Sequence, residues 1–231
     1  MVLDEYHIKI RNLKKGYTEG GNERVVFENL HLDIRRGECI SLLGRSGSGK
    51  STLLNLISGI DLPDTGSIHV DNQIINGLSE SKRTQFRRRD MGFIFQFFNL
   101  INTLTVEENV FLPLALNGLD DELHRQHAVN LLHHVGLEDR LRSFPERLSG
   151  GEQQRLAVVR ALVHQPSIIL ADEPTGNLDA DTGLRVLKLL LKLACENETT
   201  VIIVTHSEEI AAYADRKLLL QAGRLLDWSP S

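Results

Sequence analysis

The sequence predicts an α/β fold with a mostly parallel central sheet, an N-terminal antiparallel β subdomain and an inserted α-helical subdomain. Three observations lead to this prediction. Short uninterrupted apolar runs alternate with segments of helical periodicity, which is typical of parallel strands covered by helices on both faces. Residues 6–37 instead contain alternating runs of the kind that form antiparallel strands. Between Thr105 and Arg147 the apolar residues recur at helical spacing.

The central sheet is expected from short apolar runs, each of which suits a strand better than a helix by its length. A helical segment around residues 182–194 separates the last two runs, as a crossover between parallel strands requires. The expected strands are residues 39–43, 91–95, 168–171 and 201–204.

The N-terminal antiparallel layer is expected from the runs HIKI and VVFENLHLDI, which are interrupted by Gly16, Gly20 and Gly21. A turn cluster at residues 62–66 and the following SIHVDNQII add a further hairpin arm. Residues 79–89 are then expected to form a helix.

The inserted helical subdomain is expected at residues 97–163, within a single domain of residues 1–231. Thr105 is the expected N-cap of its first helix, because it precedes the start of the helical periodicity.

Composition indicates a globular protein, and 231 residues suffice for one α/β domain. The net charge of −5 gives no global attraction to nucleic acid, so we expect no direct nucleic-acid partner. Cys39 and Cys195 form neither a zinc-ligand spacing nor a disulfide framework. The N-terminus carries charges where a signal peptide needs an apolar core, and no segment approaches about 18 uninterrupted apolar residues. We therefore expect any membrane role to come through a partner.

Residues 44–52, GRSGSGKST, lie between an expected strand and an expected helix that begins near Thr52. The spacing of Gly44, Gly49, Lys50 and Ser51 matches a pattern in which backbone N–H groups face phosphates, the lysine neutralises them and the hydroxyl ligates Mg²⁺. A flexible turn would also use glycine and serine. The spacing and the strand–loop–helix context favour a phosphate loop.

Polar residues follow the other expected strands, at the sheet edge where open α/β sheets bind ligands. Asp172 would hold Mg²⁺ opposite Ser51, which leaves Glu173 to polarise an attacking water. Gln96 would orient that water or the metal. His206 would contact the γ-phosphate. Each residue alone would be an ordinary polar residue at a loop or helix start, but together beside a phosphate loop they indicate phosphoryl transfer.

Residues 148–152, LSGGE, form a second candidate anion site. Ser149 and Glu152 have the spacing of a capping box, so a well-capped helix explains part of the pattern. Gly150 and Gly151 would also bare backbone N–H groups at a helix N-terminus, where anions bind. A chain with one phosphate loop needs such a site only if it serves another subunit. We therefore expect a two-fold homodimer, with each nucleotide between one chain's loop and the other chain's Ser149 cap.

The segments GRSGSGKST, LSGGEQQR and IILADEP, together with Gln96 and His206, resemble the ATP-binding cassette family in their order and intervals, over essentially the whole chain. The resemblance implies ATP and Mg²⁺ as ligands and an ATPase whose hydrolysis is coupled to transport. Tyr17 would stack on adenine, although a lone aromatic residue on a strand more often serves packing. Ser207 departs from the family pattern, because many relatives have Asp there, and this would alter how His206 is oriented.

The resemblance assigns the site residues to three groups. The catalytic group is Lys50, Gln96, Glu173 and His206. The nucleotide-binding group is Tyr17, Gly44, Arg45, Ser46, Gly47, Ser48, Gly49, Lys50, Ser51, Thr52, Ser149, Gly150, Gly151, Glu152 and Asp179, the last of these in the D-loop Asn177-Leu178-Asp179. The metal-binding group is Ser51, Gln96 and Asp172.

Within the family, the stretches DEPTGNLD and FQFFNLINTLTVEENV are most similar to the lipoprotein-releasing and macrolide-exporter branch (LolD, MacB and FtsE types). This implies a cassette at the cytoplasmic face of the inner membrane that drives a separate permease, in export or mechanotransmission. One alternative is a soluble cassette ATPase acting on nucleic acid or ribosomes, a class that usually carries zinc-binding cysteines, a long coiled coil or tandem cassettes. Another is a small-molecule kinase, which would not need the Ser149 cap.

Phe97, Phe98, Asn99 and Leu100 follow Gln96 in an expected loop. Apolar residues in a loop are not assured of burial, so we predict that they line a groove for the permease. The alternative is that they pack on the helical subdomain. The basic run at residues 82–89 is expected to be a solvated helix face, with binding of lipid headgroups as the alternative.

Overall fold

The computed structural model describes residues 5–228, so residues 1–4 and 229–231 of the expected domain lie outside the described part. The chain forms two compact units. The first combines the chain up to Arg87 with the chain from Thr200 on, and the second contains residues 88–199. The helical subdomain expected at residues 97–163 falls within the second unit, and its boundaries stay a prediction.

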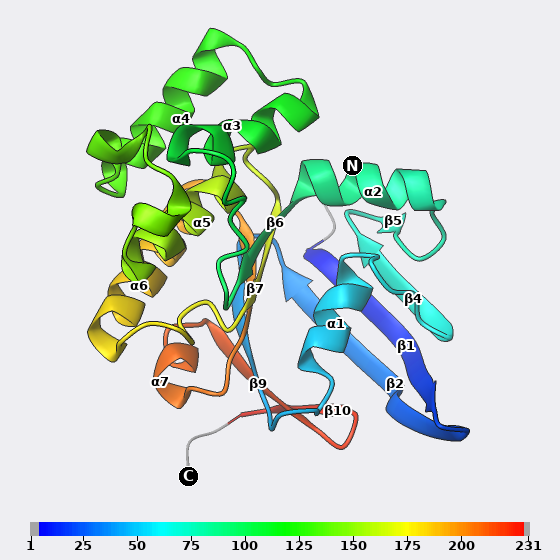
Figure 1. Ribbon diagram of the computed structural model, residues 1–231. Coiled ribbons are helices and arrows are strands. Elements are labelled where there is room, and N and C mark those ends of the chain that lie inside the picture. Colours follow the sequence, from blue (N-terminus) through cyan, green and yellow to red (C-terminus); the bar gives the residue numbers. More distant parts are fainter. Residues whose placement is uncertain (1–4, 229–231) are drawn as a thin grey trace. The chain divides into compact units, whose positions relative to one another are not determined.

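The first unit contains the predicted antiparallel sheet, with the strand order β2-β1-β4-β5 (Figure 1). Its strands are β1 (Tyr6–Glu19), β2 (Asn22–Arg35), β4 (Thr65–Val70) and β5 (Gln73–Ile74). Gly16 does not interrupt β1, in contrast to the expectation. It pairs with Val25, and a register shift between Lys15 and Gly16 accommodates the irregularity. Asp71 and Asn72 join β4 to β5 with the left-handed backbone that two-residue hairpin turns favour.

The first unit also contains strands in the order β10-β9-β3-β8. They are β3 (Cys39–Leu43), β8 (Thr200–Val204), β9 (Arg216–Gln221) and β10 (Arg224–Asp227). β3 pairs in parallel with β8 and β9, and all of β3 and β8 is buried, as uninterrupted apolar runs predict. The β9–β10 hairpin was not predicted from the sequence. Its turn is made by Ala222 and Gly223, both with positive φ.

The helices of the first unit include α1 (Lys50–Ile57) and α7 (Glu208–Ala211). α1 begins at Lys50 rather than near Thr52, so the last residues of the glycine-rich stretch already belong to the helix. Its apolar face is buried through Leu53, Leu54, Leu56 and Ile57. This burial anchors the helix that follows the expected phosphate loop.

α2 (Glu80–Asp90) carries the basic run and matches the helix expected at residues 79–89. Arg83 and Arg87 both donate to the carboxylate of Glu80. Arg87 also donates to the carbonyl of Gly59 at 2.9 Å. Arg83 is buried and Arg87 is partly buried, whereas Lys82, Arg88 and Arg89 are exposed, so only part of the basic run is a solvated face. The choice between a solvated face and a lipid site stays a prediction.

The second unit contains the helices α3 (Val106–Asn117), α4 (Glu122–His134), α5 (Gly150–Leu162) and α6 (Ala180–Glu196), with short 3-10 turns at Glu138–Arg140 and Pro145–Arg147. α5 packs against α3, α4 and α6, and the side chains of residues 156–159 on α5 are fully buried. Thr105 is the N-cap of α3, as predicted, and forms a capping box with Glu108.

The strands of the second unit are β6 (Met91–Phe95) and β7 (Ile168–Asp172), which pair in parallel. Asp172 is the last residue of β7 rather than the first residue after it, and it lies opposite Phe95. At Gly92 in β6, an added Cβ atom would lie 2.2 Å from the carbonyl oxygen of Ala161. Only glycine therefore allows β6 and α5 to pack this closely.

Candidate functional site

The glycine-rich stretch forms the loop between β3 and α1, as the phosphate-loop pattern requires. Gly49 has φ of 105°, and an added Cβ atom there would lie 2.5 Å from Cγ1 of Val26. The Nζ atom of Lys50 donates to the carbonyls of Gly44 at 2.7 Å and Arg45 at 3.1 Å. The loop thus curls around the ammonium group of Lys50, which concentrates positive charge inside it.

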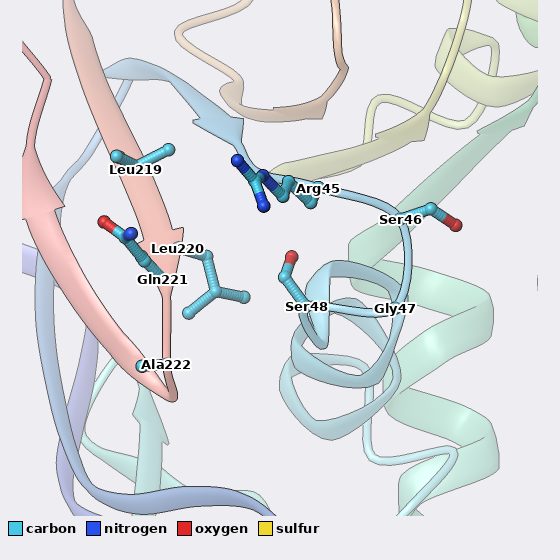
Figure 2. A pocket seen from close by; sticks show the side chains of 8 residues that line it. All are labelled: Arg45, Ser46, Gly47, Ser48, Leu219, Leu220, Gln221 and Ala222. Atoms are coloured by element: carbon cyan, nitrogen blue, oxygen red, sulfur yellow. The ribbon is translucent and has the colours of Figure 1, made fainter.

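A pocket of about 460 Å³ lies beside this loop (Figure 2). Figure 2 shows loop residues on one side and the end of β9 on the other. The lining residues are Arg45, Ser46, Gly47, Ser48, Leu219, Leu220, Gln221 and Ala222. On the β2 side, the guanidinium of Arg24 donates to the carbonyl of Gly47 at 2.7 Å. The unpredicted β9–β10 hairpin and β2 therefore both support the loop.

Tyr17 lies on β1, half-buried, and its hydroxyl donates to the carboxylate of Asp61 at 2.7 Å. The side chain of Thr52 lies close enough to the phenol to lower its pKa slightly, against the larger effects of burial and Asp61. The structure thus brings the expected adenine-stacking residue to the end of the expected phosphate loop. Burial and the hydrogen bond to Asp61 raise the pKa of Tyr17, so the phenol stays protonated at neutral pH.

His206 follows β8, whose Val204 lies opposite Leu42 of β3. The backbone N–H of Thr205 donates to the carbonyl of Leu42 at 3.2 Å. Because β3 and β8 are parallel neighbours, His206 lies at the sheet edge from which the glycine-rich loop leaves β3. Ser207 caps α7 by accepting from the N–H of Ile210 at 3.3 Å. It therefore supplies the N-cap for which aspartate is also suited.

In the second unit, Gln96 and Glu173 continue β6 and β7 from the opposed pair Phe95 and Asp172. The backbone of Glu173 is left-handed, with φ of 49°. Such a conformation is uncommon for a residue other than glycine and is often found at functional sites. The register places the expected metal ligand Asp172 and the expected water-polarising Glu173 at the strand ends, where ligands bind in such sheets.

Asn177 ties Gln96 to the segment that follows Glu173. Its Nδ2 atom donates to the backbone carbonyl of Gln96 at 2.8 Å, and its Oδ1 atom accepts from Nε2 of Gln96 at 3.4 Å. An added Cβ atom at Gly176 would lie 2.9 Å from Nε2 of Gln96. The structure therefore brings two of the expected motifs into direct contact.

The LSGGE segment opens α5 with the predicted capping box. The carboxylate of Glu152 accepts from the Ser149 N–H at 2.8 Å, and the Ser149 oxygen accepts from the Glu152 N–H at 3.4 Å. Hydrogen bonds from the Ser149 hydroxyl, at 2.7 Å, and from its N–H lower the pKa of the Glu152 carboxyl below its ordinary value. Within residues 5–228, no acceptor is seen for the backbone N–H groups of Gly150 and Gly151.

The remaining nucleotide-binding residue, Asp179, is the N-cap of α6. Its carboxylate accepts from the N–H of Thr182 at 2.9 Å, and hydrogen bonds from Thr182 lower its pKa. The neighbouring Leu178 lies close to the LSGGE segment, because a Cβ atom added at Gly150 would be 3.5 Å from its Cδ2 atom. The expected D-loop and the LSGGE segment thus lie close together within the second unit.

The loop after Gln96 exposes Phe97 and Asn99, leaves Phe98 and Leu100 partly buried, and is held through its backbone. Phe97 is 73% exposed, and both Phe98 and Asn99 have positive φ. The guanidinium of Arg160, on α5, donates to the carbonyls of Asn99 at 2.5 Å and Phe98 at 2.9 Å. Burial of the guanidinium lowers the pKa of Arg160. Whether this loop lines a groove for a permease or packs on the helical subdomain, as the two expectations had it, stays a prediction.

Sequence reasoning missed several supporting residues, which are Lys15, Arg24, Asp61, Gln154 and Arg160. Lys15 is two positions before Tyr17 on a strand, so period-two alternation could have placed both on one face. Gln154 is fully buried on α5, and its Nε2 atom donates to the carbonyl of Pro174 at 2.5 Å. Gln154 is a polar residue on the apolar face of a predicted helix, and this position could have indicated its structural role. Asp61 had no such signal, because its partners are distant in sequence.

Comparisons with known proteins identify the family. A family model described as ABC transporter matches residues 27–176. An uncharacterized ABC transporter ATP-binding protein of Mycobacterium tuberculosis is 50% identical over 219 residues, which cover 95% of this chain and 88% of that protein. The lipoprotein-releasing system ATP-binding protein LolD of Psychrobacter arcticus is 45% identical over 217 residues, which cover 94% of this chain and 96% of that protein.

Solved structures agree with these matches. The dimeric structure of MJ0796, named as a bacterial ABC transporter cassette, is 41% identical with a TM-score of 0.86, and the alignment covers 97% of this chain and 100% of that chain. A second structure of the same cassette is a dimeric post-hydrolysis state bound to ADP and Pi, at 40% identity and the same TM-score and coverage. The predicted combination of an antiparallel sheet, mostly parallel strands and helices is confirmed.

Proposed function

We propose, from the premise that this chain belongs to the ABC transporter family and is an ABC ATPase, that it drives a separate membrane permease as one half of an ATP-dependent homodimer. One observation carries the dimer. The chain has a phosphate loop in its first unit and, in its second, a helix start with two glycine N–H groups that no acceptor within residues 5–228 satisfies. Such a helix start binds an anion, and the nucleotide of a second copy supplies one.

For hydrolysis, we assign the phosphates to the backbone N–H groups of residues 44–52 and to the ammonium of Lys50. Glu173 polarises the attacking water and accepts its proton. His206 contacts the γ-phosphate, and Gln96 orients the water. The left-handed backbone of Glu173 supports its role, because strain of this kind persists where a side chain must be aimed.

A Mg²⁺ ion fits the donor set that the chain offers. Ser51, Asp172 and Gln96 present a hydroxyl, a carboxylate and an amide oxygen, which are hard ligands of the type that Mg²⁺ prefers. Mg²⁺ is usually bound through one or two carboxylates plus substrate phosphates, so a single Asp172 is sufficient. When bound, the ion would neutralise charge on the phosphates. Asp172 and Ser51 would hold it, while Glu173 remains available to the water.

The permease is proposed to dock at the loop after Gln96. Support comes from the exposure of Phe97 and from Arg160, which fixes the backbone of Phe98 and Asn99. No helix among the described residues is long and apolar enough to span a membrane. Together with the likeness to LolD, this supports a peripheral position at the cytoplasmic face of the inner membrane, in export or mechanotransmission.

The test is the solution mass of Glu173→Gln by light scattering, with and without Mg-ATP. We expect this variant to bind ATP, to lose about 10²- to 10⁴-fold in turnover and to shift from monomer to dimer only with nucleotide. Glu198→Gln is the matched control, because Glu198 also has positive φ but lies on the exposed surface. It should hydrolyse ATP at the wild-type rate.

Turnover near the wild-type rate in Glu173→Gln would show that another group positions the water. A persistent monomer would require the permease-bound form, in which Ser149→Arg should abolish ATPase activity if the LSGGE segment serves the partner's nucleotide. Unchanged activity of Ser149→Arg in that form would reject the shared site.

A further inference from the structure

Lys15 and Tyr17 lie two residues apart on β1 and so share one face of the strand. The Lys15 side chain is buried, with only 8% of the residue exposed. Its Nζ atom lies over the ring of Tyr17, 4.8 Å from the ring centroid. This distance is within the range of cation–π attraction. One face of the phenol ring is therefore covered by an ammonium group.

Asp61, in the turn after α1, contacts both Lys15 and Tyr17, and the three residues form a cluster. Its Oδ2 atom accepts from the Tyr17 hydroxyl at 2.7 Å, and its Oδ1 atom accepts from Nζ of Lys15 at 2.8 Å. Lys15 also donates to the carbonyl of Leu62 at 2.8 Å. Both carboxylate oxygens are thus in use, and each of the three side chains contacts the other two.

The charge states of the cluster are fixed near neutral pH. Burial alone would raise the pKa of Asp61, but hydrogen bonds from Lys15 and Tyr17 outweigh it, and the pKa of Asp61 is lowered. Burial and Asp61 together raise the pKa of Tyr17. A neutral phenol between a carboxylate and an ammonium therefore persists across the physiological range.

A buried charged pair is a poor way to gain stability, because apolar residues of similar volume often stabilise a fold as well or better. What this cluster supplies is orientation. Asp61 fixes the hydroxyl end of the ring, and Lys15 covers one face. Thr52, at the end of the phosphate loop, lies near the same hydroxyl. A planar ligand can stack only on the ring face opposite the ammonium.

We propose that Lys15 and Asp61 are positioning residues that hold the ring of Tyr17 for stacking on the nucleotide base. This inference rests on the proposed function, since it takes Tyr17 as the residue that contacts the base. The two residues act through the ring and do not touch the phosphates. They fix the ring relative to Thr52, and hence relative to the loop that holds the phosphates.

The test compares ATP with inorganic tripolyphosphate, which lacks a base, by calorimetric titration of the full chain. We expect Asp61→Asn to weaken ATP binding by about tenfold, the worth of one hydrogen bond to a charged group. Binding of tripolyphosphate should stay unchanged. Lys15→Met should weaken ATP binding in the same selective way. Asp64→Asn is the matched control, because the Asp64 carboxylate accepts from the N–H of Gly16 instead.

A double-mutant cycle separates positioning from general stability. In a Tyr17→Ala background, Asp61→Asn should have no further effect on ATP binding, because no ring remains to be held. Tyr17→Phe keeps the ring and removes only the hydroxyl, so it provides a second route if Asp61→Asn folds poorly. Tyr17→Phe should weaken ATP binding and leave tripolyphosphate binding unchanged.

The outcomes distinguish this inference from the proposed function. If Tyr17→Ala weakens ATP binding while Asp61→Asn, Lys15→Met and Tyr17→Phe do not, the positioning role is wrong and Tyr17 still contacts the base. If Tyr17→Ala itself leaves ATP binding unchanged, the base does not stack on Tyr17, and both the assignment of Tyr17 and this inference are rejected. Equal losses for ATP and tripolyphosphate would show a merely structural cluster.

Discussion

The N-termini of α3 and α5 carry the same capping box but differ in what their free N–H groups contact. Thr105 and Glu108 cap α3, and Ser149 and Glu152 cap α5, with the same reciprocal pattern in each. In both caps, the glutamate accepts from the N–H of the capping residue at 2.8 Å. By cap geometry alone, the two helix starts are equivalent.

The starts of α3 and α5 differ at the two residues that follow the cap. At α3, the N–H groups of Val106 and Glu107 donate to the carbonyls of Ser143 at 2.9 Å and Leu141 at 3.0 Å. At α5, the corresponding positions are Gly150 and Gly151, and the described part of the chain offers their N–H groups no acceptor. The chain itself therefore completes the start of α3, whereas the start of α5 retains two donors for a ligand. A capping box alone does not make an anion site, because N–H groups without a local acceptor are also needed.

The largest effect is expected from Gly150→Asp. Gly150 does not have positive φ, and an added Cβ atom would meet Leu178 and Phe98 at 3.5 and 3.9 Å, so the substitution fits the fold. Its carboxylate would compete with the incoming phosphate, and we expect ATPase activity to fall at least about 100-fold. Phosphate release measures the rate. Gly150→Asn, with a neutral side chain of the same size, is the control and should lose much less; an equal loss would assign the effect to shape rather than charge.

Removing the two caps should affect stability alike and activity differently. Ser149→Ala and Thr105→Ala should each reduce stability by about 1 kcal/mol, or roughly 2–4 °C in Tm, measured by calorimetry. Only Ser149→Ala should also weaken ATP-dependent dimerisation in the Glu173→Gln background, by about tenfold. The comparison would be contradicted if Thr105→Ala weakened dimerisation to the same extent.

A smaller effect is expected from the charge of the capping glutamates. Glu152→Gln keeps the capping hydrogen bonds and removes a negative charge beside the two free N–H groups. We expect it to lower the ATP concentration needed for dimerisation by about two- to fivefold, the range of a partly exposed charge interaction. Glu108→Gln should leave that concentration unchanged. A titration of mass against ATP tests both, and a higher requirement in Glu152→Gln would indicate that the carboxylate assists the site.

The smallest effect is on acid stability. Hydrogen bonds from Thr105 and Ser149 lower the pKa values of Glu108 and Glu152 below the ordinary value of 4.5. Each carboxylate therefore stabilises the folded state above pH 4.5, and this contribution is lost as pH falls through the lowered pKa. The double variant Glu108→Gln/Glu152→Gln should show a shallower fall in Tm below pH 4.5. An unchanged acid profile would mean that the pKa values of the two carboxyls are the same in the folded and the unfolded protein.

Much of the site was predictable because strand ends and helix caps are local features. A few residues each were enough to predict β3, β6, β7 and β8. Ser149 and Thr105 each indicated the start of a helix within one turn. Family resemblance then supplied roles that local pattern could not. The β9–β10 hairpin was missed because LLLQAGRLLD has no clear period, and its place is fixed by pairing with β3.

Contacts between distant residues were beyond sequence reasoning. Asp61 meets Tyr17 across 44 positions of the chain, and Asn177 meets Gln96 across 81. Nothing in the local sequence of either pair indicates the other member. The carbonyl acceptors of the first N–H groups of α3 could not be predicted from sequence either, because any residue can supply a backbone carbonyl.

The bond between Asn177 and Gln96 has a mechanical consequence. Asn177 hydrogen-bonds to both the main chain and the side chain of Gln96. Two residues later, Asp179 caps α6. Leu178 between them lies against Gly150. A displacement of Phe97 would therefore be transmitted to the start of α5 with little loss. If a permease docks at this loop as proposed, its movement would reach the start of α5 through these contacts, where the partner's nucleotide is proposed to bind.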